Sequence, residues 1–172
     1  SWQGGDARVG FYSRVIFPRL CDFGLDRPFV AEQRQHVLAS ASGNVLEIGF
    51  GTGLNLPYYP ASLRKLTTVD PNAGMNHRAA QRIRQSKVEV ECHLLTGEGL
   101  PFADASFDTV VSTFTLCSIP NVSAALAELY RAPKPGSLFL FLEHGLSSEP
   151  SVQKWQRRLN GLQRWFADGC HL

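Results

Sequence analysis

The stretch Val45-Leu46-Glu47-Ile48-Gly49-Phe50-Gly51-Thr52-Gly53 decides the fold of this chain. Its short apolar run predicts a buried strand, and its glycines let the backbone turn sharply and approach a ligand closely. A helix that follows such a turn offers unpaired backbone N–H groups and a positive dipole end. We therefore expect a strand, a ligand-binding loop and a helix, suited to a nucleotide-like ligand with a carboxylate.

The spacing of these glycines separates two classes of nucleotide-binding loop. A dinucleotide fingerprint has the pattern G-x-G-x-x-G/A, so its third small residue would stand at Leu54 when the count starts at Gly49. Leucine does not fit that position. The pattern therefore disfavours a nicotinamide-dependent oxidoreductase.

The remainder of the chain alternates between strand-like and helix-like segments. Strands are expected at 44–48, 66–69, 88–95, 107–113 and 138–142, and helices at 28–41, 73–86, 122–131 and 152–166. Strands separated by helix-length connections form a parallel sheet covered on both faces. We predict an α/β fold with a Rossmann-like, doubly wound, mostly parallel sheet of five strands and flanking helices.

The first 43 residues are expected to form a helical cap on a single domain that spans residues 1–172. Apolar positions Val9, Tyr12, Val15 and Ile16 follow a helical spacing, and Pro18 is expected to end that helix. Two interpretations are open for the aromatic side chains of Phe11 and Tyr12: they could cover a bound cofactor, or they could simply pack against the domain. No composition shift divides the chain.

Composition excludes several classes of function. The net charge of +2 is too small to favour a nucleic-acid partner. The four cysteines lack a CxxC pair, so we expect no metal, reduced thiols and a cytoplasmic location. The apolar runs are far shorter than the roughly 20 residues of a membrane span.

Acidic and polar residues at the strand ends predict the ligand contacts. Asp70 closes the second strand, where a carboxylate can accept hydrogen bonds from both hydroxyls of a ribose. The neighbouring Pro71 and Asn72 also permit a plain Asp-Pro-Asn turn. Both interpretations place Asp70 at the carboxyl edge of the sheet.

The extra glycine at Gly53 and the acid at Glu47 resemble motif I of class I methyltransferases. The segment Thr96-Gly97-Glu98-Gly99-Leu100-Pro101-Phe102 is similar to the adenine-reading segment of the methyltransferase type 11 pattern, although an acid is common in that pattern where Thr96 stands. The resemblance implies S-adenosyl-L-methionine as cofactor and S-adenosyl-L-homocysteine as product. The implied cofactor-binding residues are Glu47, Gly49, Phe50, Gly51, Thr52, Gly53, Asp70, Pro71, Asn72, Thr96, Gly97, Glu98, Thr113, Phe114 and Tyr12.

Three further segments resemble the methyltransferase-like 7 family. They are Leu116-Cys117-Ser118, Phe141-Leu142-Glu143-His144 and Phe166-Ala167-Asp168-Gly169-Cys170. The mammalian members are membrane-associated alkyl thiol methyltransferases, so the resemblance implies methyl transfer to a small, rather apolar acceptor, with a thiol favoured. The alternatives are a lipid or quinone-precursor methyltransferase and a non-catalytic cofactor-binding module.

His144 and Cys117 are the candidate catalytic residues. A thiolate is the nucleophilic form of a thiol, and a histidine near neutral pKa can remove the proton. His144 is the candidate base, with loop orientation as the alternative. For Cys117 the alternative is packing as a small apolar side chain.

The C-terminal part raises two expectations about surfaces. The resemblance implies final antiparallel strands that are not expected within residues 143–172, so the run 137–142 is expected to form a bare sheet edge that favours a homo-oligomer. Trp155 and Trp165 are expected to pack in the core, with peripheral membrane contact as the alternative.

Overall fold

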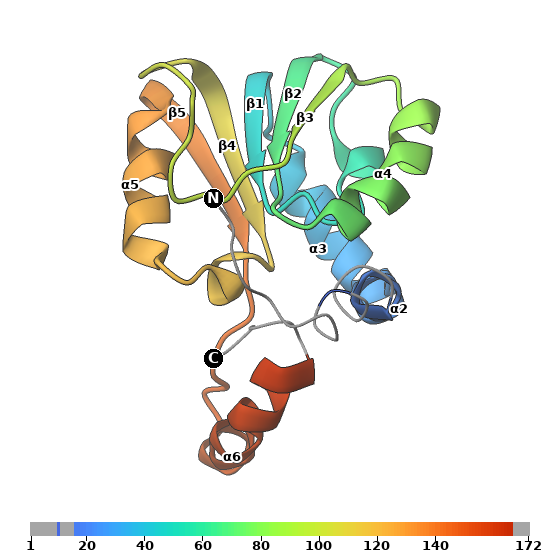
Figure 1. Cartoon of the computed structure of the whole chain (residues 1–172), viewed down its shortest axis with the longest axis vertical. Coiled ribbons are helices and arrows are strands. Elements are labelled where there is room, and N and C mark those ends of the chain that lie inside the picture. The colour runs from blue at the N-terminus through green and yellow to red at the C-terminus, as the bar shows by residue number, and fades with distance from the viewer. Residues whose placement is uncertain (1–9, 11–15, 167–172) are drawn as a thin grey trace.

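The computed structural model describes residue 10 and residues 16–166 of the chain. Five strands form one sheet in the order β3-β2-β1-β4-β5 (Figure 1). Their bounds are β1 Gly43–Ile48, β2 Leu63–Val69, β3 Val90–His93, β4 Phe107–Thr113 and β5 Pro133–Leu142. Every pairing of neighbours is parallel. The predicted parallel, doubly wound sheet is confirmed.

Helices cover both faces of this sheet (Figure 1). α3 Pro28–Leu38 and α4 Ala73–Gln85 cover one face and α5 Val122–Arg131 covers the other. α2 Phe17–Leu25 packs against α4, and α6 Pro150–Phe166 lies away from the sheet (Figure 1). The alternation along β1 divides the core in two, because successive side chains leave opposite faces of a strand. Val45 packs with residues of α3 and α4, whereas Leu46 and Ile48 pack with residues of α5.

Two local expectations were wrong. Pro18 does not end a helix; it lies in the first turn of α2, where its missing N–H costs no hydrogen bond. The loop after β1 leads only into a 3-10 turn, η2 at Leu56–Tyr58, rather than into a long helix. Pro60 explains its shortness, because the residue before a proline avoids the helical conformation, and Tyr59 is extended with φ −70° and ψ 137°.

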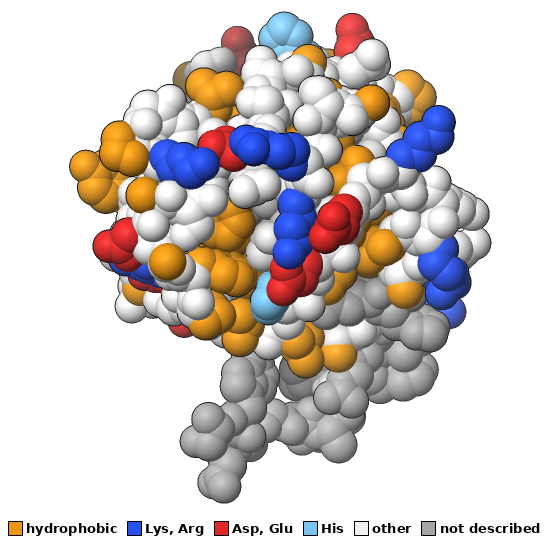
Figure 2. Space-filling model, turned by 90° about the horizontal axis from the view of Figure 1, so that it is seen from above, with side chains coloured by type: hydrophobic (Ala, Val, Ile, Leu, Met, Phe, Trp, Pro, Cys, Tyr) orange, Lys and Arg blue, Asp and Glu red, His pale blue; other side chains and the backbone are white. Residues whose placement is uncertain are grey.

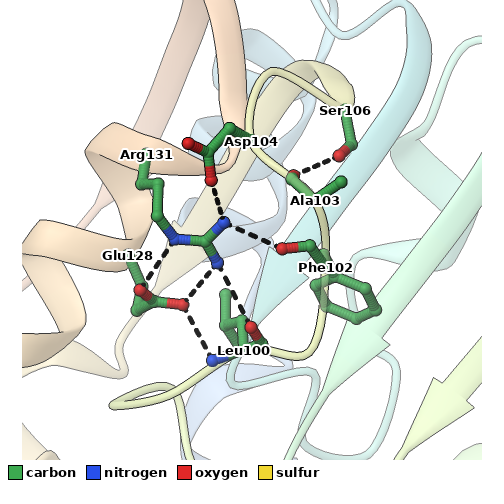
Figure 3. A network of polar contacts seen from close by, with 7 residues as sticks. All are labelled: Leu100, Phe102, Ala103, Asp104, Ser106, Glu128 and Arg131. Atoms are coloured by element: carbon green, nitrogen blue, oxygen red, sulfur yellow. Dashed lines mark hydrogen bonds and ion pairs between the residues drawn. The ribbon is translucent and has the colours of Figure 1, made fainter.

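Arg131 on α5 holds the segment that precedes β4 (Figure 3). Its guanidinium donates to both carboxylate oxygens of Glu128, at 3.0 and 2.8 Å, and to Asp104 at 2.5 Å. It also donates to the carbonyl oxygens of Leu100 and Phe102, at 3.2 and 2.8 Å. Glu128 in turn accepts from the Leu100 N–H at 2.8 Å. Arg131 thereby joins α5 to the segment 100–104, which leads into β4.

β5 is an edge strand of the described sheet and exposes apolar side chains. Leu138, Phe139 and Phe141 are 45%, 42% and 59% exposed, and the two phenylalanine rings stack at 5.5 Å. The expectation that Trp155 packs in the core was wrong, because its side chain on α6 is 61% exposed. No helix among residues 16–166 combines the length and apolarity that a membrane crossing requires.

Candidate active site

A cavity of about 230 Å³ opens at the carboxyl ends of the central strands. The strand order reverses between β1 and β4, and ligands of open α/β sheets bind at such a switch point. The cavity lies beside the β1 loop, the β2 and β4 ends and α2. Its walls are formed by Phe17, Cys21, Leu25, Arg34, Ile48, Gly49, Phe50, Gly51, Thr52, Leu54, Asn55, Val69, Asp70, Pro71, Asn72, Thr96, Gly97, Glu98, Thr113, Phe114, Thr115, Ser118, Ile119 and Pro120.

The glycines of the β1 loop have different tasks. Gly49 has φ +74°, and a Cβ there would lie 1.8 Å from the Thr115 Oγ1, so this position needs glycine for the fold itself. Gly51 has φ +58°, but a Cβ there would meet only the Gly49 carbonyl oxygen, at 3.9 Å. A Cβ at Gly53 would touch Leu56 and Phe50, which are packed core residues. Gly51 is thus the glycine whose open side belongs to the cavity wall.

Asp70 ends β2 and is only 7% exposed. Its two carboxylate oxygens accept from the N–H groups of Gly51 and Asn72, each at 2.8 Å. Burial raises the pKa of Asp70, and these two backbone hydrogen bonds oppose the shift. Each oxygen keeps a further lone pair, so the carboxylate can accept ligand hydroxyls as well.

A buried arginine from α3 also lines the cavity. Arg34 is 4% exposed, and its guanidinium donates to the side-chain oxygen of Asn55 and to the hydroxyl of Thr113 at 3.3 Å. Its Nε has no hydrogen-bond partner among the described residues. Burial lowers the pKa of Arg34 from its usual value, an effect that the nearby Glu47 carboxylate opposes. Arginine still stays protonated, so the cavity contains a fixed positive charge.

Glu47 lies behind this wall rather than in it. The Asn55 amide donates to one of its carboxylate oxygens and the Tyr59 hydroxyl to the other, each at 2.7 Å. Burial raises the pKa of Glu47 to about 7, and these two hydrogen bonds and Arg34 act in the opposite direction. Glu47 therefore positions Asn55, and Asn55 positions the Arg34 guanidinium.

The α2 helix is fixed over the β1 loop by an acid that sequence reasoning missed. Asp22 pairs with Arg78 at 2.6 Å and Arg82 at 3.4 Å, both on α4, and accepts from the Thr52 hydroxyl. Arg82 also donates to the Thr52 carbonyl oxygen at 2.8 Å. These contacts place Cys21 in the cavity wall.

Phe114, directly after β4, has a strained backbone with φ +53°. The guanidinium carbon of Arg34 lies over its ring, 5.4 Å from the centroid, and the His144 ring stacks with it at 6.3 Å. The next residue, Thr115, donates its N–H to Glu143 at 3.0 Å. The ends of β4 and β5 are thus joined at the cavity wall.

Most of the predicted cofactor-binding residues come together in this cavity. Those that line it are Gly49, Phe50, Gly51, Thr52, Asp70, Pro71, Asn72, Thr96, Gly97, Glu98, Thr113 and Phe114. Glu47 and Gly53 do not line it, and Tyr12 is outside the described residues. The two candidate catalytic residues, Cys117 and His144, border the lining residues Ser118 and Phe114.

Sequence reasoning missed Arg34 and Asn55. Asn55 stands two positions after Gly53, and an amide so close to a glycine loop is a usable signal. Arg34 gives no such signal, because α3 shows no marked amphipathic pattern that would distinguish an inward arginine from a solvated one. Only the packing of α3 against the sheet places it.

The chain is similar in sequence to curated methyltransferases. The chain is 37% identical over 134 residues to thiol S-methyltransferase TMT1B of Rattus norvegicus, covering 74% of this chain and 54% of that protein. It spans about half the length of the curated thiol S-methyltransferases that it matches.

Solved structures share the fold. A methyltransferase of Thermotoga maritima superposes with a TM-score of 0.67 at 24% identity, covering 94% of this chain and 72% of that one. An N-methyltransferase of Haemonchus contortus, solved with phosphomonomethylethanolamine and S-adenosylhomocysteine, superposes with a TM-score of 0.68 at 18% identity, covering 97% and 45%.

The family comparison matches a central stretch of the chain, from β1 into β5. The model of the methyltransferase domain matches residues 46–141, which is more than half of the 172 residues. The matched stretch contains the β1 loop, Asp70 and the β4 end, all of which meet at the cavity. The chain therefore belongs to the methyltransferase domain family and has the Rossmann-like fold of class I S-adenosylmethionine methyltransferases.

Proposed function

We propose that this chain binds S-adenosyl-L-methionine in the cavity and transfers its methyl group to the sulfur of a small, rather apolar thiol. The observation that carries the proposal is that two buried groups of opposite charge line the same cavity, Asp70 at the end of β2 and Arg34 from α3. A zwitterionic nucleoside donor needs both an acceptor for its ribose and a partner for its carboxylate. The similarity to thiol S-methyltransferases supports sulfur as the acceptor atom.

We infer one orientation of the donor from the residues that line the cavity. Its ribose hydroxyls meet Asp70, and its adenine lies beside the segment 96–98 and Pro71. Its methionine carboxylate meets the Arg34 guanidinium, since Arg34 is the buried cation in the described wall. This orientation points the sulfonium toward the β4 end, where Phe114 and Thr115 form the wall.

The reaction is an in-line displacement at the methyl carbon. The acceptor sulfur forms a bond to that carbon while the bond from carbon to the sulfonium sulfur breaks, and the electron pair goes to the departing S-adenosylhomocysteine. Holding the reacting atoms about 3 to 3.5 Å apart and in line supplies most of the catalysis. The acceptor must also lose its proton, because the thiolate is the nucleophile. His144 and Cys117, which border the cavity, are the proposed residues that promote this loss of the proton.

Two measurements test the proposal together. Calorimetry should show S-adenosylhomocysteine binding more tightly than NAD, and transfer from methyl-labelled S-adenosylmethionine should reach an alkyl thiol but neither a phenol nor vesicles of phosphatidylethanolamine. Tighter NAD binding would overturn the cofactor assignment. Transfer to the phenol or lipid in preference to the thiol would overturn the acceptor assignment.

A further inference from the structure

Three potential metal ligands from two strand ends meet beside the cavity. Cys117 lies in the 3-10 turn η3 at Leu116–Ser118, and Glu143 and His144 directly follow β5. The Cys117 Sγ, a Glu143 carboxylate oxygen and a His144 ring nitrogen all lie within 4.8 Å of one another. We propose that these side chains bind one zinc ion that holds the acceptor thiol as a thiolate, a role that rests on the proposed function.

The donor set is one that zinc prefers. Thiolate sulfur, imidazole nitrogen and carboxylate oxygen are its usual ligands, and catalytic zinc sites combine three protein ligands with one open position. Ligand bonds of about 2.0 to 2.3 Å place the ligand atoms of a tetrahedral site roughly 3.3 to 3.8 Å apart. The observed separations therefore require modest side-chain rotations, and the turn η3 and the segment after β5 already face each other.

Glu143 provides the independent observation that points to a cation. One of its oxygens accepts from the Ser112 hydroxyl at 3.1 Å and from the N–H groups of Thr115 and Leu116 at 3.0 and 3.2 Å. Its other oxygen, Oε2, is buried and has no hydrogen-bond partner among the described residues. Leaving a buried carboxylate oxygen without a partner is costly, and a bound cation removes that cost.

The hydrogen bonds to Glu143 have the form of an outer shell around a metal ligand. Such contacts fix the orientation of the ligand and tune the ion. Because these hydrogen bonds hold the Glu143 carboxylate in place, its Oε2 has a fixed position from which it can bind the ion. His144 is similarly oriented by the Phe114 ring, against which it stacks.

The cluster is placed to act on the acceptor of the proposed reaction. Phe114, Thr115 and Ser118 line the cavity, and they are the residues that touch or adjoin the three ligands. An ion held there lies on the side of the cavity to which the donor sulfonium points in the proposed orientation. Its open position is then accessible to a sulfur atom from the acceptor.

The chemistry balances without another reactant. A thiol that binds the ion releases its proton to solvent, because a bound cation favours the thiolate. The thiolate sulfur then bonds to the methyl carbon as the sulfonium bond breaks. One negative and one positive charge become two neutral products, the thioether and S-adenosylhomocysteine. A neutral thioether is a weaker zinc ligand than a thiolate, so the product dissociates.

Metal titration of the chain tests the site directly. After dialysis against a chelator, calorimetry with zinc should show one ion bound per chain, and cobalt(II) in its place should give the near-ultraviolet charge-transfer band of a cobalt thiolate. Cys117→Ser should abolish that band, and His144→Ala and Glu143→Gln should each weaken zinc binding at least tenfold. The matched controls Cys92→Ser, His36→Ala and Glu149→Gln change exposed residues and should leave zinc binding unchanged.

Titration of S-adenosylhomocysteine on the same samples separates the two proposals. Absence of zinc binding, or wild-type zinc binding by Cys117→Ser, would overturn the metal site while normal S-adenosylhomocysteine binding left the proposed function intact. Absence of S-adenosylhomocysteine binding would overturn the proposed function instead. If Cys117→Ser fails to fold by thermal melting, the milder His144→Gln must still weaken zinc binding.

Discussion

At the scale of single residues, the proposed orientation of the donor pairs Arg34 with the methionine carboxylate and leaves the nucleoside end to other residues. We predict that Arg34→Met weakens S-adenosylhomocysteine binding at least tenfold, since a charge-assisted hydrogen bond contributes about 1.5 to 3 kcal/mol. Binding of 5′-methylthioadenosine should change little, because that nucleoside has no carboxylate. Calorimetry with both ligands measures this, with Arg84→Met on the exposed side of α4 as control. Equal losses for the two ligands would contradict the assignment.

Asp70 should show the complementary behaviour. Asp70→Ala removes the acceptor expected for both ribose hydroxyls and also frees the N–H groups of Gly51 and Asn72. We expect at least a tenfold loss of affinity for S-adenosylhomocysteine and for 5′-methylthioadenosine alike, since both carry the ribose. Asp104→Ala, which alters an exposed carboxylate paired with Arg131, is the control. If Asp70→Ala binds S-adenosylhomocysteine as tightly as the wild type does, the cofactor does not bind at Asp70.

At the scale of elements, the β1 loop separates the cost of backbone strain from the cost of filling the cavity. Gly51 and Gly136 both have positive φ, +58° and +78°, and neither has a heavy atom within 3.4 Å of an added Cβ. Alanine should cost each position about 1 to 2 kcal/mol of unfolding free energy. Only Gly51→Ala should also abolish S-adenosylhomocysteine binding, because Gly51 lines the cavity. Denaturant unfolding and calorimetry check both, and binding by Gly51→Ala would show that the loop leaves room.

The α5 helix depends on Arg131 in a pH-dependent way. The Arg131 guanidinium holds the pKa of Glu128 below its usual value of 4.5, so the pair stabilises the fold above that pH and loses its effect as the pH falls through the lowered pKa. Arg131→Met should lower the melting temperature by several degrees at pH 7 and by much less at pH 3. Arg157→Met, an exposed change on α6, should have little effect at either pH. If Arg131→Met lowers the melting temperature by as much at pH 3 as at pH 7, the lost stability comes from the hydrogen bonds of Arg131 to the Leu100 and Phe102 carbonyl oxygens.

At the scale of the whole molecule, charged and apolar side chains are distributed differently over different parts of the surface. The face in Figure 2 shows basic and acidic side chains side by side rather than one continuous basic area. The β5 edge is different, because apolar Phe139 and Phe141 lie exposed on an edge strand of the described sheet. An exposed apolar strand edge favours pairing with another strand.

We therefore predict self-association through β5. Light scattering after size exclusion should show a concentration-dependent dimer, and Phe141→Lys should shift it toward monomer by placing a charge on the edge. Tyr130→Lys is the matched control, since Tyr130 on α5 is 89% exposed but lies on no strand edge. A monomer at every concentration would refute this edge as an interface.

Structural features that depend on residues close together in the sequence could be predicted from the sequence alone. The run from Val45 to Gly53 and the alternation of strands and helices determined the parallel sheet, and Asp70 determined the β2 side of the cavity. Glycine conformation, strand alternation and strand ends are local properties of the backbone. Parallel strands then bring their carboxyl ends to one edge whatever the details of packing.

Tertiary structure alone decided which distant side chains meet. Arg34 enters the cavity 21 positions before Asn55 and 79 before Thr113, and Cys117 meets Glu143 and His144 across two strand ends. The direction of Arg34 depends on how α3 packs, and the position of α2, which begins at Phe17, over the β1 loop depends on the pairing of Asp22 with Arg78. No local pattern encodes these pairings, because a side chain's direction follows from the packing of its whole element against the sheet.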